Sequence, residues 1–209
     1  AVYVGAFTAD LANGTGKIPY ADGSTYDGAW TNGVIDGRGV ATYANGLVYD
    51  GDFVNAKNEG TGTMTYPDGY TYARSWADGQ RNGMGTATYA DGTVYEGEFL
   101  NGQRHGTGTI TLPDGFVYAG EWQDGEISGK GVATYANGDV YEGAFVRGRR
   151  EGPGTMRYAT GTETTGDWAD GALLTPAPAP EPATAEEAPV NGDAPVNVDT
   201  APAEPAPAN

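Results

Sequence analysis

The sequence predicts an all-β protein: an elongated, single-layer, twisted antiparallel sheet built from tandem β-hairpins of 23 residues. Three features predict this fold, namely a tyrosine every 23 residues, an aromatic residue four positions later, and glycines at eleven and thirteen positions after the tyrosine. A fixed period of this kind is typical of stacked units that bury a face only against their neighbours. The tyrosines are Tyr3, Tyr26, Tyr49, Tyr72, Tyr95, Tyr118 and Tyr141, and the aromatics are Phe7, Trp30, Phe53, Trp76, Phe99, Trp122, Phe145 and Trp168.

Each 23-residue unit contains two short segments of alternating character that are separated by Asn-Gly or Asp-Gly, which indicates two antiparallel strands. The three-residue loop 44–46 is typical of a type I turn closed by a left-handed glycine. This loop predicts a register that places Ala41 opposite Tyr49 and Gly37 opposite Phe53. Since cross-strand partners share a face, the aromatics and glycines line one side, and we expect the glycines to let the Trp and Phe rings lie over the backbone.

We interpret the aromatic face as a packed core, because the size of its aromatic residue and the size of a second residue vary together from repeat to repeat. Repeats with Trp carry Ala fifteen positions after the tyrosine, and repeats with Phe carry Ile or Met, which we interpret as volume compensation. The opposite face carries threonines and acidic residues, and we expect it to be solvated. Its acidic residues are Asp27, Asp50, Asp52, Glu96, Glu98, Glu121 and Glu142.

The composition limits the classes of partner. The formal charge of −17 opposes binding to nucleic acid and disfavours anionic lipid, because both need a cationic surface. Cysteine is absent, which excludes disulfides and thiolate metal sites. The chain begins at Ala1, inside a repeat and without an initiator Met, so we expect that a signal peptide or earlier repeats have been removed, and we lean to an exported or cell-envelope bacterial protein.

The chain divides into two segments of different composition. Residues 1–174 hold about seven and a half repeats, whereas residues 175–209 hold nine prolines, six acidic residues and no basic residue. The second segment has too few apolar side chains to offset the entropy of ordering, so we predict a disordered, acidic C-terminal tail.

The pattern Tyr-x-Gly-x-Trp/Phe, then Asn/Asp-Gly, Gly-x-Gly and a tyrosine before Asn/Asp-Gly resembles the MORN (membrane occupation and recognition nexus) repeat. The resemblance covers Tyr3 to about Gly171 and implies a twisted sheet of successive hairpins that serves as a non-catalytic module. MORN arrays act as cytoskeletal or membrane-contact scaffolds, dimerisation devices, or appendages to catalytic domains. Two departures from the pattern are Arg74, which replaces a glycine, and Ala56, which replaces a turn glycine.

No arrangement of residues points to catalysis, a cofactor or a metal. The single histidine, His105, is interpreted as a turn residue. The Gly-x-Gly pairs lack the helix that phosphate binding needs, and the carboxylates form a ladder rather than one pair in contrasting environments. We therefore predict that the protein is not an enzyme.

The predicted function is a protein-interaction scaffold with protein partners and possible self-association through the ends or faces of the sheet. One alternative is a peripheral membrane module that binds phospholipid headgroups through its basic end; another is a glycan-binding groove in which Trp and Tyr stack on sugar rings. The candidate partner-binding residues are Arg74, Tyr72, Trp76, Trp122, Arg147, Arg149 and Arg150.

Overall fold

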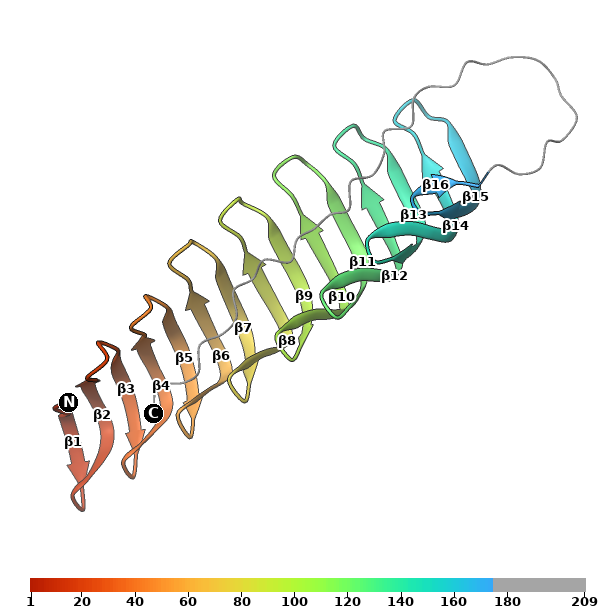
Figure 1. Ribbon diagram of the computed structural model, residues 1–209. Coiled ribbons are helices and arrows are strands. Elements are labelled where there is room, and N and C mark those ends of the chain that lie inside the picture. Colours follow the sequence, from red (N-terminus) through yellow and green to blue (C-terminus); the bar gives the residue numbers. More distant parts are fainter. Residues whose placement is uncertain (175–209) are drawn as a thin grey trace, which may run out of the picture. The chain divides into compact units, whose positions relative to one another are not determined.

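A computed structural model describes residues 1–174, and within this range the protein consists of β-strands and turns without a helix. Sixteen strands form one open antiparallel sheet in sequence order (Figure 1). The predicted fold class is therefore confirmed, while the predicted tail, 175–209, lies outside the described residues. The strands are β1 Val4–Thr8, β2 Leu11–Pro19, β3 Thr25–Thr31, β4 Val34–Thr42, β5 Val48–Val54, β6 Lys57–Thr65, β7 Thr71–Ala77, β8 Gln80–Thr88, β9 Val94–Leu100, β10 Gln103–Thr111, β11 Val117–Gln123, β12 Glu126–Thr134, β13 Val140–Val146, β14 Arg149–Arg157, β15 Glu163–Ala169 and β16 Ala172–Leu173.

The described residues divide into two compact parts, each of which is considered by itself. The N-terminal half is Ala1–Gln103, and the C-terminal half begins at Arg104. Each 23-residue repeat is named here by its first tyrosine, so that the Tyr26 repeat comprises β3 and β4.

The observed register follows the turn chemistry. Gly37 pairs with Phe53 and Ala41 with Tyr49, as the three-residue loop predicts. Gly46 has a φ of +87° and its amide donates to the carbonyl of the residue three positions earlier. A left-handed glycine at this position closes the turn without strain, so loop length alone assigns the side chains to their faces.

Two classes of glycine serve different purposes in each repeat. Gly37 has a φ of +102°, a conformation that favours glycine over any other residue. Gly28 and Gly39 lie beneath the ring of Tyr26, because a Cβ atom on either would come within 2.3–2.5 Å of the tyrosine hydroxyl. The ring over this glycine pair is thus the tyrosine's, which corrects the expectation that the glycines make room for the Trp and Phe rings.

A ladder of aromatic contacts connects successive repeats. The Tyr26 ring makes edge-to-face contacts with Trp30 of its own repeat at 5.5 Å and with Phe53 of the next repeat at 5.2 Å between centroids. The indole nitrogen of Trp30 also donates a hydrogen bond of 3.1 Å to the carbonyl of Gly16 in the preceding repeat. Such ring pairs contribute beyond their buried area, and they make each repeat dependent on its neighbours.

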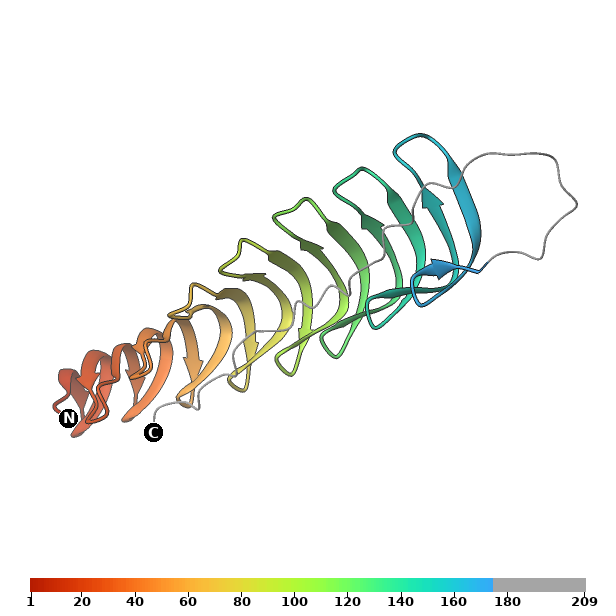
Figure 2. The ribbon, with the colours of Figure 1, turned by 45° about the horizontal axis from the view of Figure 1, so that its top comes forward.

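The tyrosines of this ladder are buried although the sheet has one layer. Tyr49, Tyr72, Tyr95, Tyr118 and Tyr141 all have 0% exposure. A flat single layer would leave such rings open on one side, but the hairpins are bent (Figure 2). We call the inner, aromatic side of the bend the trough and the opposite side the outer face. The residues fifteen positions after each tyrosine face the trough as predicted, whereas their volume compensation with Trp and Phe stays a prediction.

Candidate binding surfaces

The residue nine positions after each tyrosine lies opposite the Trp or Phe of its own hairpin, and we call it the bridge position. Trp30 pairs with Ile35, and Trp76 pairs with Arg81. The sequence analysis did not identify this position, although the register that places Trp and Phe in the trough also places their partners there. Residues at the bridge position that are buried are Ile35, Asn58, Arg81, Arg104, Ile127 and Arg150.

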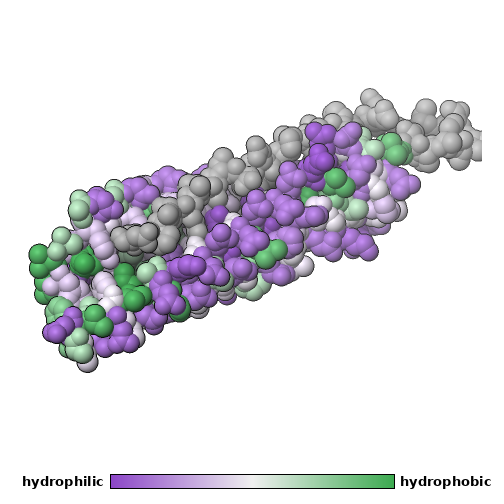
Figure 3. Space-filling view, turned by 60° about the horizontal axis from the view of Figure 1, so that its bottom comes forward, coloured by the Kyte–Doolittle hydropathy of each residue, from purple (hydrophilic) through white to green (hydrophobic). Residues whose placement is uncertain are grey.

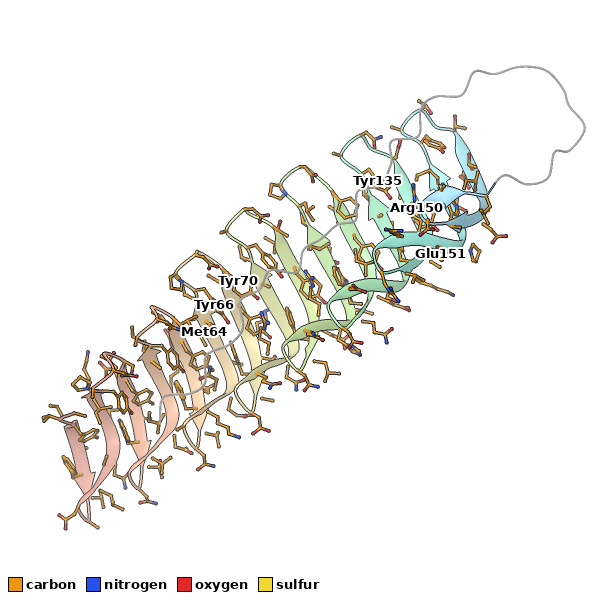
Figure 4. All side chains as sticks on the ribbon, in the orientation of Figure 1. Met64, Tyr66, Tyr70, Tyr135, Arg150 and Glu151 are labelled. Carbon is orange, nitrogen blue, oxygen red and sulfur yellow. The ribbon has the colours of Figure 1, made fainter. Side chains whose placement is uncertain are left out.

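Arg81 crosses the trough of the N-terminal half. Its Nη1 donates a hydrogen bond of 2.5 Å to the Tyr70 hydroxyl, and its Nη2 donates one of 2.6 Å to the Gly102 carbonyl of the next repeat. The guanidinium carbon lies 5.7–5.9 Å from the ring centroids of Tyr70, Tyr72 and Phe99, which is the range of cation–π attraction. Burial raises the pKa of Tyr70, and the nearby Arg81 cation lowers it in part. Tyr70 also packs on Tyr66 at 4.9 Å (Figure 4).

Two bridge-position arginines of the C-terminal half also contact an aromatic ring and the following hairpin. Arg104 donates through Nε and Nη2 to the Gly125 carbonyl of the next repeat, at 3.2 and 2.8 Å, and lies 4.8 Å from the Trp122 ring centroid. Arg150 donates to the equivalent turn glycine of its next repeat and lies 4.5 Å from the Trp168 ring centroid. Bridge-position arginines therefore cover the aromatic ladder and tie it to the following hairpin.

In the Tyr26 repeat the bridge position holds Ile35, and a shallow hollow of about 20 Å³ that is open to solvent lies beside it. An isoleucine is too short to cross the trough as Arg81 does. Burial raises the pKa of Tyr20 at the edge of the hollow, and the charge of Asp22 adds to this effect. The hollow is lined by Tyr20, Ser24, Thr25, Tyr26, Ile35, Ala41, Thr42, Tyr43, Phe53 and Ala56.

The three aromatic candidates from the sequence lie within the core. Tyr72 is 0% exposed, and Trp76 and Trp122 are each 3% exposed. Tyr72 donates its hydroxyl to the Ser75 carbonyl at 2.9 Å, and Trp76 donates its indole nitrogen to the Gly62 carbonyl at 3.1 Å. These side chains join the hairpins to one another, so a partner would meet them only if the trough opened.

Arg74 is exposed and has a φ of +110°, which is unusual for a residue with a Cβ atom. At the equivalent glycine of the Tyr26 repeat, Gly28, a Cβ atom would come within 2.4 Å of the facing Gly39 backbone. The ordinary backbone conformation of this position therefore has no room for a side chain. The Arg74 backbone pairs with Gly62 and Gly85, whereas its side chain has no hydrogen bond, ion pair or ring contact with another described residue.

The basic cluster near residues 147–157 is largely neutralised. Arg149 pairs with Asp170 at 2.8 Å, and Arg157 pairs with Glu142 at 3.2 Å. Arg150 is buried at 4% exposure in the trough, whereas Arg147 is exposed at a hairpin tip with a φ of +48°. The sequence cluster is thus divided between two faces and does not form one cationic patch.

The outer face is polar and carries the predicted rows of acids and threonines. Asp50 lies opposite Thr63 in the register and pairs with Arg38 at 2.9 Å. Asp52 accepts hydrogen bonds from both the backbone nitrogen and the hydroxyl of Thr61. Figure 3 shows hydrophilic residues over much of the visible surface and apolar residues gathered at the N-terminal end. The exposed apolar residues there are Val2, Val4, Phe7 and Leu11.

His105 lies within strand β10 and not in a turn, which corrects the sequence interpretation. Its Nδ1 is 4.0 Å from a carboxylate oxygen of Asp124. In residues 1–174, no group of three or more His, Cys, Asp or Glu residues is arranged to hold a metal ion. A search of the same range for long apolar helices that could cross a membrane finds none.

The solved structures that match this chain include TCP domains of Sas-4 and CPAP. A Sas-4 TCP domain of Drosophila melanogaster, solved with a proline-rich motif of Ana2, is 16% identical over 73% of this chain and 77% of that chain, with a TM-score of 0.42. The TCP10c domain of the same protein is 15% identical over 78% of this chain and 98% of that chain, with a TM-score of 0.45. The TCP10 domain of Danio rerio CPAP is 17% identical over 73% of this chain and 83% of that chain, with a TM-score of 0.34. Such low scores carry no inference about binding.

A comparison with curated protein sequences gives no significant match. The model of the MORN repeat family, in contrast, matches seven times, at residues 3–25, 26–48, 49–69, 75–94, 95–117, 118–140 and 141–163. The matched segments cover well over half of the chain and leave out residues 70–74, where Arg74 departs from the pattern. The chain therefore belongs to the MORN repeat family.

Proposed function

We propose that this protein is a non-enzymatic protein-interaction scaffold, in which the repeats within residues 1–174 carry the binding surfaces and residues 175–209 form a tail. The observation that carries the proposal is the recurrence of the same chemistry on the outer face of several hairpins. In the N-terminal half, carboxylates recur at Asp27, Asp50 and Glu96, on strands β3, β5 and β9. A small molecule would cover one or two repeats, whereas an extended protein segment matches the whole row.

The burial of the trough side chains supports this assignment. Arginines and tryptophans that carry hydrogen-bond donors use them between neighbouring repeats, as Arg81 does with Gly102 and Trp76 with Gly62. What the hairpins offer to solvent is mainly the acidic outer face. An acidic periodic surface favours a basic protein partner, because complementary charge speeds and orients association.

The two alternatives have less support in the structure than protein binding has. Headgroup binding at the basic end would depend mainly on Arg147, because Arg149 and Arg157 are ion-paired and Arg150 is buried. Glycan stacking needs accessible rings, but Trp122 is 3% exposed. No observation favours either of them over protein binding.

Crosslinking mass spectrometry in an extract of the source cells tests the proposal. Three proteins are compared: the full chain, a Glu96→Gln/Glu98→Gln variant, and a Thr86→Ser variant that leaves the charge of the outer face unchanged. We expect crosslinks from a small set of proteins to the outer face, fewer crosslinks with the doubly neutralised variant, and fewer again as salt is raised. A chain that crosslinks to no protein above background, or equally in all three forms, would contradict an outer-face scaffold.

A further inference from the structure

The hollow beside Ile35 occupies the place that a guanidinium fills in other repeats. In the Tyr72 repeat, Arg81 extends from the bridge position to Tyr70 and closes the trough. In the Tyr26 repeat, Ile35 holds the same position and Ser24 stands where Tyr70 stands. Both substitutions shorten the side chains, so an apolar space lined by tyrosines stays open at this repeat.

The spacing of this lining matches a polyproline II helix. Tyr20 and Tyr43 occupy equivalent positions in adjacent repeats and both line the hollow. Adjacent repeats are two strands apart, or ~9.6 Å at ~4.8 Å per strand. A polyproline II helix advances ~9.3 Å in three residues, at ~3.1 Å each. Residues three apart in such a helix would therefore meet the same part of two successive repeats.

Within the tail, one pair of prolines has this spacing. Pro202 and Pro205 are three residues apart, and no other two of the nine tail prolines are. The 27 residues from 175 to 201 connect them to Leu174 and span up to ~84 Å at ~3.1 Å per residue. This length lets residues 202–207 return to the repeats of their own chain.

We propose that residues 202–207 of the same molecule bind across this shallow hollow as a polyproline II segment, with Pro202 and Pro205 against Tyr20 and Tyr43. Aromatic-lined grooves bind proline-rich segments because the fixed φ of proline lowers the entropy lost on binding. The contact is independent of the outer-face partner. It would cover the trough at the Tyr26 repeat, where Ile35 leaves the hollow beside it uncovered.

The charges predict how salt affects this contact. The tail contains six acidic and no basic residues, and the whole chain carries −17, so the repeats are acidic as well. Two like-charged segments repel, and the attraction between proline and tyrosine is apolar. Added salt should therefore strengthen tail binding, whereas it weakens binding of a basic partner to the outer face.

Paramagnetic relaxation in the full-length chain tests the proposal. Because the chain has no cysteine, Asn209→Cys gives a single attachment point for a nitroxide label. We expect selective loss of amide signals around Tyr20, Ile35 and Tyr43, and a larger loss at higher salt. A sample that mixes isotope-labelled chains with spin-labelled, unlabelled chains should lose none of these signals; if it does, the tail of a second copy is the occupant and the intramolecular contact is overturned.

Matched variants identify the two sides of the contact. Ile35→Arg places in the hollow the arginine that other repeats have at the bridge position, and it should abolish the signal loss. Val40→Arg adds the same charge to the outer face of the same strand, and the signal loss should remain. Pro202→Gly/Pro205→Gly should also abolish it, and Pro189→Gly/Pro195→Gly should leave it intact. The two proline variants change no residue of the sheet, so they decide the question even if Ile35→Arg unfolds. Signal loss that survives Pro202→Gly/Pro205→Gly would overturn the proposal.

Discussion

Arg81 donates a hydrogen bond of 2.5 Å to the Tyr70 hydroxyl, which joins the two ends of a bent hairpin. Arg81 lies near the start of β8, whereas Tyr70 precedes β7, so the side chains meet only because the strands curve around the trough. The Arg81 guanidinium also lies 5.8 Å from the Tyr72 ring centroid, and Tyr72 is 0% exposed. A bridging arginine thus performs the covering role that a second layer has in a β-sandwich.

Replacing Arg81 with leucine should destabilise the protein far more than replacing an exposed arginine. The change removes hydrogen bonds from a charged donor, each worth about 1.5–3 kcal/mol, along with the cation–π contacts. Arg149→Leu is the control, because Arg149 forms an exposed ion pair with Asp170, and such pairs contribute about 0–1 kcal/mol. Urea denaturation followed by circular dichroism measures both. Equal midpoints for the two variants would show that Arg81 does not bridge the trough.

The two classes of glycine should respond differently to alanine. At Gly39 a Cβ atom would come within 2.3 Å of the Tyr26 hydroxyl, so Gly39→Ala must displace the buried ring. We expect a loss of about 1–3 kcal/mol, as for other overpacked cores. Gly23, with a φ of +94°, has nothing within 4 Å of an added Cβ, so Gly23→Ala should cost only its backbone strain, about 1 kcal/mol. Thermal denaturation measures the stability of both variants. A larger loss of stability for Gly23→Ala than for Gly39→Ala would refute the division into two classes of glycine.

The buried tyrosines predict a loss of stability at alkaline pH. Burial raises the pKa of Tyr26 to about 12 and also raises the pKa of Tyr49 and Tyr118. The folded state holds these protons more tightly than the unfolded state, so the stabilisation is complete below the unfolded pKa of ~10 and is lost as pH rises through the folded values. Phenolate absorbance and circular dichroism, recorded together from pH 8 to 13, should show late ionisation that coincides with unfolding. Complete ionisation near pH 10 with an intact sheet would disagree with this burial.

Arg74→Gly should increase stability. The change relieves a side chain held at a φ of +110°, a strain of about 1–3 kcal/mol, against a cost of about 0.5–1 kcal/mol for the freedom of glycine in the unfolded chain. We expect a net gain of about 1 kcal/mol in urea denaturation. If Arg74 contacts a partner, the same variant binds it more weakly, which crosslinking yield measures. A loss of stability would mean that the guanidinium makes a contact within the fold.

Much of the fold follows from local chemistry in the sequence. The Asn-Gly and Asp-Gly turns determine loop length, loop length determines register, and register places Ala41 opposite Tyr49 as observed. The acidic rows on the outer face follow from the same alternation. These features depend on a few neighbouring residues, so a single repeat contains enough information to predict them.

The bridge position was missed because it contradicts the usual distribution of arginine. Arg104 and Arg150 are each 4% exposed, whereas arginine is seldom fully buried in proteins. The signal was nevertheless present, since the residue opposite each Trp or Phe must share its face. The curvature of the hairpins could not be predicted from the sequence either. Contacts such as Arg81 with Tyr70 connect opposite ends of a hairpin, so no local sequence pattern indicates them.

The central claim is that the buried face of each repeat is completed by the next repeat, and a double-mutant cycle tests it most directly. Arg81 lies 5.7 Å from the Phe99 ring of the following repeat. Arg81→Leu and Phe99→Leu, alone and together, should show a coupling of about 0.5–3 kcal/mol in urea denaturation, as residues in contact do. Arg81→Leu with Phe145→Leu, three repeats along, should be additive within about 0.5 kcal/mol. Additivity in the first cycle, or equal coupling in both, would contradict a core built between neighbouring repeats.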